Sequence, residues 1–274
     1  HIYEPSLVRR TDGMLRHMML SRLRSLERRM DMEAALSASS VVTLSTWMKN
    51  RIRDIYGLEA AVVRPGVDTG FWKPVKAERT GAVLSIGALW PFKGHGTALE
   101  TLSLLPSDSR PSLTVVADRE YPGYRERLVN AAAKLGVGLR ILSGVTDQIL
   151  RELYCSASAV LCCQMNEPYG LVPLEAMACG TPVVAVREGG FTDNVRDGEN
   201  GMLADRDPQK LASALERLLS DEELRSSLTK AGREFVTVER TPAAASESLY
   251  ALLMDAVEYT EGLSSHGMNS RFRG

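Results

Sequence analysis

Residues 159–186 have the sequence "AVLCCQMNEPYGLVPLEAMACGTPVVAV", and this stretch decides the fold class. Apolar runs stand at its two ends, 159–163 and 182–186, and a segment with helical periodicity, 171–178, lies between them. Runs that are apolar throughout favour strands covered on both faces, as in a parallel sheet, because a strand with one solvated face alternates apolar and polar residues. The stretch therefore predicts a strand, a loop, a helix and a second strand.

The same alternation begins upstream, near Arg79. It is typical of a doubly wound, Rossmann-like α/β domain, in which helices cover both faces of a parallel sheet. We predict this domain over residues 75–240. Its other strands are expected at 83–89, 112–118 and 139–144, and its other helices between them at 97–105, 124–135 and 147–154.

Only helices follow the last predicted strand. Asp207 is expected to cap the first of them, with Pro208 in its first turn. A second helix is expected from Asp221, and a closing helix over 241–262. Residues 263–274 are predicted to form a tail.

Residues 1–63 differ from the domain that follows. A helix is predicted over 14–35 from an apolar stripe flanked by arginines, and a strand follows at 41–45. A single helix and strand cannot bury their own apolar faces, so we expect a partial second Rossmann-like domain, joined to the first by a linker at 64–74. Because the sequence opens on histidine rather than methionine, we expect a chain truncated at its amino end. The stripe consists of Leu15, Met19, Leu23, Leu26 and Met30.

The composition predicts a compact soluble protein of 274 residues, with 44% hydrophobic and 24% charged residues and a formal net charge of −1. This balance gives no reason to expect nucleic acid as a partner. The four cysteines lie on apolar segments without C-x-x-C spacing, so we expect buried, reduced thiols in a cytoplasmic protein. Neither a run of about eighteen apolar residues nor a signal peptide is visible.

The loop at 164–169 stands where a ligand of a doubly wound sheet binds, at the carboxyl end of a strand. The helix that begins near Gly170 adds free N–H groups, which suit a phosphate. Glu167 in the loop and Glu175 in the helix would accept hydrogen bonds from paired hydroxyls, which suits a sugar-nucleotide. The alternative is that Glu167 complements the helix dipole and Glu175 is solvated. The apolar flanks of Glu175 favour the ligand interpretation.

The stretch "EPYGLVPLEAMACGTPVVAVREGG" closely resembles the E-x7-E signature of the retaining glycosyltransferases with the GT-B fold, the group 1 family. Four other segments resemble family motifs in the family's order, and the resemblance covers residues 40 to about 235. They are "VVTLSTWMKNRI", "RPGVDTGFWKP", "SIGALWPFKG" and "DGENGMLAD".

The resemblance implies that the carboxyl-terminal domain binds a nucleoside diphosphate sugar and the amino-terminal domain binds the acceptor. Glu175 would hold the ribose hydroxyls and Glu167 the hydroxyls of the donor sugar. Lys93 would pair with the diphosphate as charge develops on it, although a lysine there is otherwise a solvated charge. The backbone N–H groups that would meet the sugar and the diphosphate are those of Tyr169, Gly170, Leu171 and Val172.

Three other parts of the site are implied in the same way. Gly87 corresponds to the family's glycine at a strand end. The turn of Gly144, Val145 and Thr146 would border the base, unless it is an ordinary turn. His1 would match a histidine on the acceptor side of the site, unless it is an ordinary loop residue.

One departure from the family's pattern concerns charge. The family commonly has arginine directly after the strand-end glycine, where it holds the diphosphate, but this chain has Ala88. Loss of one charge-assisted contact costs about 1.5–3 kcal/mol. Arg119, on the loop after the next predicted strand, is a hypothetical replacement.

The function implied is transfer of a hexose from a nucleoside diphosphate sugar to a saccharide, lipid or small-molecule acceptor. By resemblance the reaction needs no metal and no cofactor. One alternative is a non-catalytic nucleotide-sugar-binding module or one half of a two-chain transferase, and another is a phosphorylase or a nucleotide-sugar hydrolase. The helix at 14–35 has two interpretations, packing against a missing sheet or peripheral contact with an anionic membrane at its cytoplasmic face.

Overall fold

The computed structural model describes residues 14–265, and the chain divides into two compact units. Of the described residues, the smaller unit holds 14–43, 49–62 and 252–265. The larger unit holds 44–48 and 63–251. His1, and the predicted tail beyond residue 265, lie outside the described residues.

The smaller unit contains a short parallel sheet and long helices. Strand β1 (Val42–Thr43) pairs with β2 (Ala61–Val62). Helix α1 spans Met14–Ser37, α2 spans Thr46–Tyr56 and α10 spans Pro242–Ser265, and parts of the last two belong to the larger unit. Three members of the predicted apolar stripe, Leu23, Leu26 and Met30, are exposed on α1. No helix within residues 14–265 is both long and apolar enough to cross a membrane.

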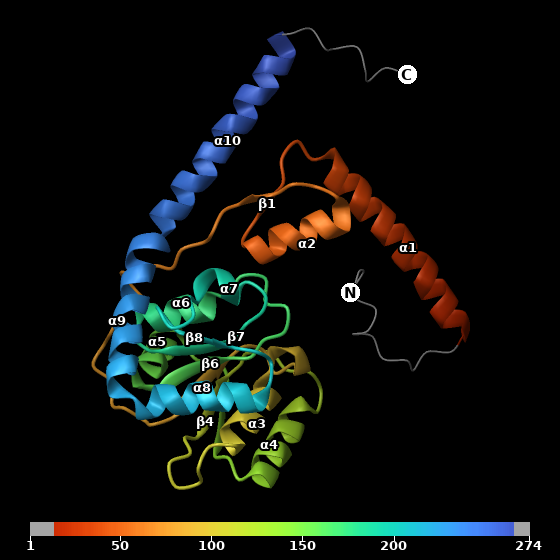
Figure 1. The fold of residues 1–274 in the computed structure, drawn as a ribbon. Helices are drawn as coiled ribbons and strands as arrows, with labels where there is room; N and C mark the ends of the chain where they lie inside the picture. The colour runs from red at the N-terminus through yellow and green to blue at the C-terminus, as the bar shows by residue number, and fades with distance from the viewer. Residues whose placement is uncertain (1–13, 266–274) are drawn as a thin grey trace. The chain divides into compact units, whose positions relative to one another are not determined.

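The larger unit is built on a parallel sheet with the strand order β5-β4-β3-β6-β7-β8 (Figure 1). The chain steps outward from β3 to β5, returns to the other side of β3, and steps outward again from β6 to β8. The topological switch therefore lies between β3 and β6, which pair side by side. The strands are β3 (Val83–Ile86), β4 (Leu113–Val116), β5 (Leu139–Leu142), β6 (Ala159–Cys162), β7 (Val183–Val186) and β8 (Met202–Ala204).

Helices cover both faces of this sheet. On one face α3 (His95–Ser103) packs against α4 (Tyr124–Leu135) and α8 (Pro208–Ser220). On the other face α6 packs against α5 and α9, and also against β6 and β7. The elements of this second layer are α5 (Asp147–Ser156), α6 (Leu171–Ala178), the short α7 (Phe191–Asn194) and α9 (Glu222–Glu239).

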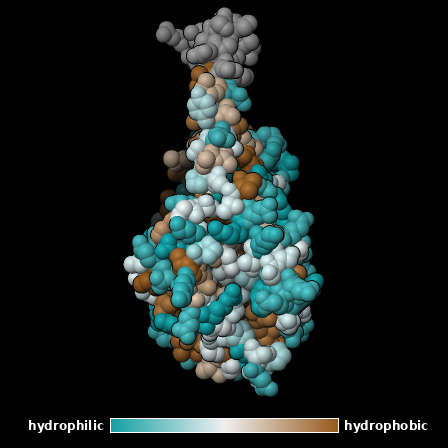
Figure 2. All heavy atoms as spheres, turned by 90° about the vertical axis from the view of Figure 1, so that its left-hand side faces the viewer, coloured by the Kyte–Doolittle hydropathy of each residue, from teal (hydrophilic) through white to brown (hydrophobic). Residues whose placement is uncertain are grey.

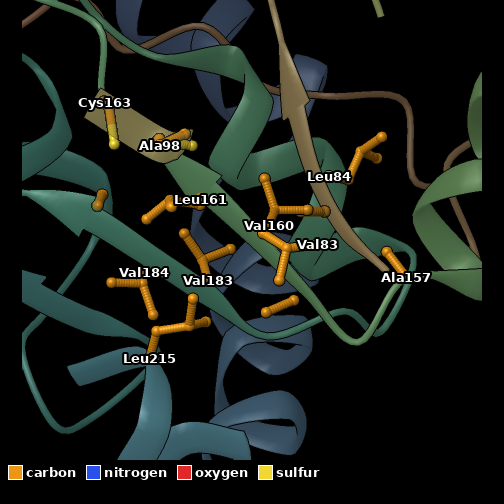
Figure 3. Close-up of a cluster of buried hydrophobic side chains, with 14 of the residues drawn as sticks. Val83, Leu84, Ala98, Ala157, Val160, Leu161, Cys163, Val183, Val184 and Leu215 are labelled. Atoms are coloured by element: carbon orange, nitrogen blue, oxygen red, sulfur yellow. The ribbon is translucent and has the colours of Figure 1, made fainter. Parts of the chain in front are cut away.

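The core lies between the central strands and their helices (Figure 3). Val83 on β3, Leu161 on β6 and Val183 on β7 are fully buried, as is Leu215 on α8. Burial of adjacent residues on both faces explains why these strands lack polar alternation. The prediction of a doubly wound α/β domain is confirmed.

Some elements differ from the predicted ones. Strands β2 and β8 were not predicted, because they have only two and three residues. Helix α2 was not predicted either. The closing helix begins at Pro242 and extends to Ser265, into the predicted tail. The four cysteines are free, but Cys155 is only half-buried, contrary to expectation.

Leu161→Ala is expected to lower the free energy of unfolding by about 2–5 kcal/mol, because it leaves a cavity in the centre of the sheet. Leu104→Ala, at a side chain that is 50% exposed, is the matched control and should change it by about 0.5 kcal/mol or less. Urea denaturation followed by circular dichroism measures both. Equal effects of the two substitutions would contradict the core described above.

Candidate functional site

The loops after β3 and β6 meet at the topological switch. Gly94 has φ +76°, and a Cβ there would overlap the carbonyl group of Cys163. The Met165 N–H donates to the Phe92 carbonyl at 2.8 Å. Residues 87–94 and 163–170 therefore lie against each other, and only glycine fits at position 94.

Lys93 and Glu167 are brought together by this contact. The Lys93 ammonium group lies 3.1 Å from a Glu167 carboxylate oxygen, and both side chains are partly exposed. The aliphatic stem of Lys93 lies over Gly87, which has φ +145° and where a Cβ would be 3.3 Å from the lysine Cδ. A partly exposed pair of this kind contributes only about 0.2–1 kcal/mol, so a ligand can displace it at little cost.

Two glycines after β7, Gly189 and Gly190, lie against the backbone of the loop before α6. The Gly190 N–H donates to the Glu167 carbonyl at 2.7 Å. A Cβ at Gly190 would be 2.5 Å from the Pro168 carbonyl oxygen, and one at Gly189 would be 2.6 Å from the Glu167 carbonyl oxygen. Because neither residue has a side chain, the loop after β7 can contact the Glu167 backbone directly.

Arg206 and Glu188 hold the other side of the same loop. The Arg206 guanidinium donates to the carbonyls of Cys163 at 2.7 Å and Gln164 at 2.8 Å. It also pairs with the Glu188 carboxylate, which accepts the Asn166 N–H at 3.3 Å. Neither residue is among the predicted site residues. Glu188 lies two residues after the predicted strand 182–186, and this is its sequence signal. Arg206 lies two residues after β8, a strand that the sequence did not predict.

The start of α6 presents its backbone donors. Gly170 is the N-cap residue, and no side chain caps the helix. The Asn194 amide donates to the carbonyls of Tyr169 and Gly170, at 2.8 and 3.3 Å, which fixes the turn from behind. The first N–H groups of a helix have no partner inside it, so those of Leu171 and Val172 are available to an anion.

Tyr169 has a structural side chain. Its hydroxyl donates to the Pro65 carbonyl at 2.6 Å, and burial raises its pKa to about 12. Only its backbone is therefore available to a ligand.

Glu175 is not a solvated surface residue. Its carboxylate accepts a hydrogen bond from the fully buried Tyr154 hydroxyl at 2.6 Å. Burial raises the pKa of Glu175 above its ordinary value. The alternative that Glu175 is a solvated residue is therefore wrong.

The turn after β5 is tied to the neighbouring β4 loop. The Gly144 N–H donates to the Asp118 carboxylate at 2.9 Å. The Thr146 hydroxyl caps α5 by accepting the Ile149 N–H at 3.3 Å, and Val145 packs against the core. The side chains of Val145 and Thr146 thus have structural roles, and any contact with a base stays a prediction.

Arg119 lies beside the position where arginine is missing. The Leu89 N–H, next to Ala88, donates to the Arg119 carbonyl at 2.7 Å. The Arg119 side chain is exposed, and it makes no ion pair with any other residue in the described part of the chain. Nearby Arg125, by contrast, is paired with Glu120.

His95 is a further residue of this region that the sequence did not single out. It is fully buried, and burial lowers its pKa, so the ring is neutral. Nε2 lies 3.0 Å from the Gly87 carbonyl and 3.2 Å from that of Ala88, and Nδ1 lies 3.0 Å from the Ser85 hydroxyl. This geometry fits an Nε2–H that donates to the two carbonyls and an Nδ1 that accepts from Ser85. His95 therefore fixes the strand end over which Lys93 lies.

Metal-binding side chains do not gather here. Within residues 14–265, no three or more His, Cys, Asp or Glu residues are arranged to hold a metal ion.

Comparison with known proteins gives several relatives. The chain is 37% identical over 220 residues to a D-inositol 3-phosphate glycosyltransferase from Acidothermus cellulolyticus, covering 71% of this chain and 49% of the relative. It is 30% identical over 229 residues to an alpha-maltose-1-phosphate synthase from Mycobacterium tuberculosis, covering 73% of this chain and 59% of the relative. The chain thus spans about half the length of the curated relatives it matches.

Solved structures show the same fold. The Anabaena protein HepE, in complex with UDP and glucose, superposes with a TM-score of 0.76 at 22% identity, covering 83% of this chain and 66% of HepE. The sucrose-phosphate synthase from Thermosynechococcus elongatus superposes with a TM-score of 0.74 at 24% identity, covering 85% and 62% of the two chains. The family model for glycosyl transferases group 1 matches residues 67–235, more than half of the sequence. The chain therefore belongs to the group 1 glycosyltransferase family.

Proposed function

We propose that this chain carries the donor-binding part of a retaining glycosyltransferase, which moves a hexose from a nucleoside diphosphate sugar to an acceptor hydroxyl. One observation carries the proposal: the Lys93–Glu167 pair, 3.1 Å apart, stands beside the uncapped start of α6 at the topological switch. A cation, a carboxylate and free N–H groups together match the diphosphate and the hydroxyls of such a donor.

The proposed binding mode gives each group one task. Lys93 leaves its weak pair with Glu167 and contacts the diphosphate, while Glu167 accepts hydrogen bonds from the sugar hydroxyls. The N–H groups at the start of α6 meet the diphosphate oxygens. Glu175, held by the Tyr154 hydroxyl at 2.6 Å, accepts hydrogen bonds from the ribose hydroxyls.

The proposed reaction breaks the bond between the anomeric carbon and the diphosphate and forms one from the same carbon to the acceptor oxygen. The proton of the acceptor hydroxyl passes to the leaving diphosphate, so no protein base is required. Lys93 and the helix start stabilise the charge that develops on the leaving group. A metal ion and a cofactor are not part of this proposal.

A second candidate is a nucleotide-sugar-binding module without transferase activity. Ala88 favours it, because one cation of the family's diphosphate grip is missing. The two candidates share the donor site and differ in turnover, so an assay of hexose transfer by the full-length protein separates them.

Glu175→Gln is expected to weaken UDP binding about tenfold or more at neutral pH, since a hydrogen bond to a charged group contributes about 1.5–3 kcal/mol. Isothermal titration calorimetry with UDP and GDP measures the affinity. Because the pKa of Glu175 is raised, the wild-type affinity should fall with decreasing pH as the carboxylate becomes protonated. The ionisation of UDP affects both proteins equally. The difference between their affinities therefore isolates the pH dependence that Glu175 causes.

Absence of measurable binding of either nucleotide by the wild-type chain would contradict the proposed donor site. A Glu175→Gln chain with unchanged affinity would remove Glu175 from it.

Arg119→Ala is expected to weaken UDP binding about tenfold, if Arg119 supplies the charge that Ala88 lacks. Adding Ala88→Arg to this variant should restore the affinity. Arg140→Ala, at an exposed arginine on β5, is the matched control for net charge. Affinity of Arg119→Ala equal to that of the control would show that Arg119 takes no part.

Gly190→Ala is expected to reduce UDP affinity about tenfold or more, because the new methyl group would displace the backbone of Pro168 and Tyr169. Gly96→Ala is the control, since the nearest atom to its added Cβ, the Tyr124 hydroxyl oxygen, lies 3.8 Å away. The same calorimetry measures both variants. If Gly190→Ala binds UDP like the control, the glycine pair does not set the position of the loop.

A further inference from the structure

A hollow of the larger unit lies at the end of α6 that is opposite the Glu167 loop. It has a volume of about 550 Å³ and opens between one face of α9 and the irregular segment 74–79. It is also lined by Cys179, Gly180 and Pro182, between the end of α6 and the start of β7. Figure 2 shows the side of the molecule on which α9 lies in Figure 1, where hydrophilic side chains predominate.

The lining of this hollow is strongly basic. Five cationic residues and a single carboxylate, Glu222, line it, whereas the whole chain has a formal net charge of −1. The cations come from two of the elements that line the hollow. They are Lys76 and Arg79 on the segment 74–79, and Arg225, Lys230 and Arg233 on α9.

Two of the five cations have a partner within residues 14–265. Arg225 pairs with Glu222, and Arg233 donates to the Ala178 carbonyl at 2.6 Å. Lys76, Arg79 and Lys230 form no ion pair or hydrogen bond with any residue of the described chain. Three cations without a direct partner around one hollow favour the binding of an anion between them.

The remaining lining determines which kind of anion fits. The hydroxyls of Ser226 and Thr229 lie on the same face of α9 as the cations, and Pro74, Val75 and Pro182 give apolar contacts. Cations and hydroxyls are the donors that bind phosphate oxygens, and the volume is that of a small-molecule site. We propose that this hollow binds a small phosphate-bearing molecule.

The proposed site is separate from the donor site. Helix α6 has eight residues, so its two ends lie about 12 Å apart. The donor loop precedes its first residue, and the basic hollow lies beyond its last. The proposal therefore does not depend on the proposed transferase function.

Arg79 and Lys230 are the residues to change. Both are exposed, so their replacement leaves the core intact. Lys76 is less suitable because it also borders a neighbouring hollow that contains Glu78 and Glu152.

The test is calorimetric titration of the chain with inorganic pyrophosphate. All proteins carry Lys93→Gln, which weakens binding at the donor site. Adding Arg79→Gln and Lys230→Gln is expected to lower the pyrophosphate affinity about tenfold or more. Lys134→Gln with Arg140→Gln, at two exposed cations elsewhere in the same unit, removes equal charge and should change the affinity about twofold or less.

Equal losses in the two double variants would overturn the proposal, because pyrophosphate would then respond only to net charge. Absence of millimolar or tighter binding in the Lys93→Gln chain would overturn it as well. UDP binding by the wild-type chain tests the donor site separately, so either site can fail while the other stands.

Discussion

The close approach of two loops is the constraint on which the candidate site depends. Gly94, after β3, lies so near the carbonyl of Cys163, after β6, that no other residue fits. This contact exists because β3 and β6 are neighbours in the sheet although more than seventy residues separate them in the sequence. It places Lys93 beside Glu167 and fixes both at the end of the sheet where doubly wound domains bind ligands. A larger side chain at position 94 would separate the cation from the carboxylate.

Other contacts hold the loops after β3 and β6 in position. Arg206 and Glu188 hold the backbone of the β6 loop, and Gly190 lies beneath it. His95 holds the end of β3 from inside the core. The Ser45 hydroxyl donates to the Pro168 carbonyl at 2.6 Å. These contacts leave the Lys93–Glu167 pair and the start of α6 as the groups that a ligand can engage.

The sequence predicted the parts that follow from local pattern. Continuous apolar runs predicted the central strands because both faces of the sheet are covered, and the resemblance proposed Lys93, Glu167 and Glu175 as candidate site residues. The sequence pattern did not predict β8, because three residues after a turn-rich segment give no periodicity. Arg206 and His95 were also missed, because their roles arise from contacts with residues that only the fold brings near. The partner of Glu175, Tyr154, lies on a different helix and carries no motif of its own.

Hydrogen exchange of the backbone amides, measured with and without UDP, tests the central claim most directly. The N–H groups that meet the ligand become protected, so exchange should slow in peptides that cover 87–94 and 166–175. Peptides from 222–233, at the other end of α6, should be unchanged at UDP concentrations that saturate only the proposed donor site. Binding of UDP with no added protection in 166–175 would contradict the assignment of this loop as the donor site.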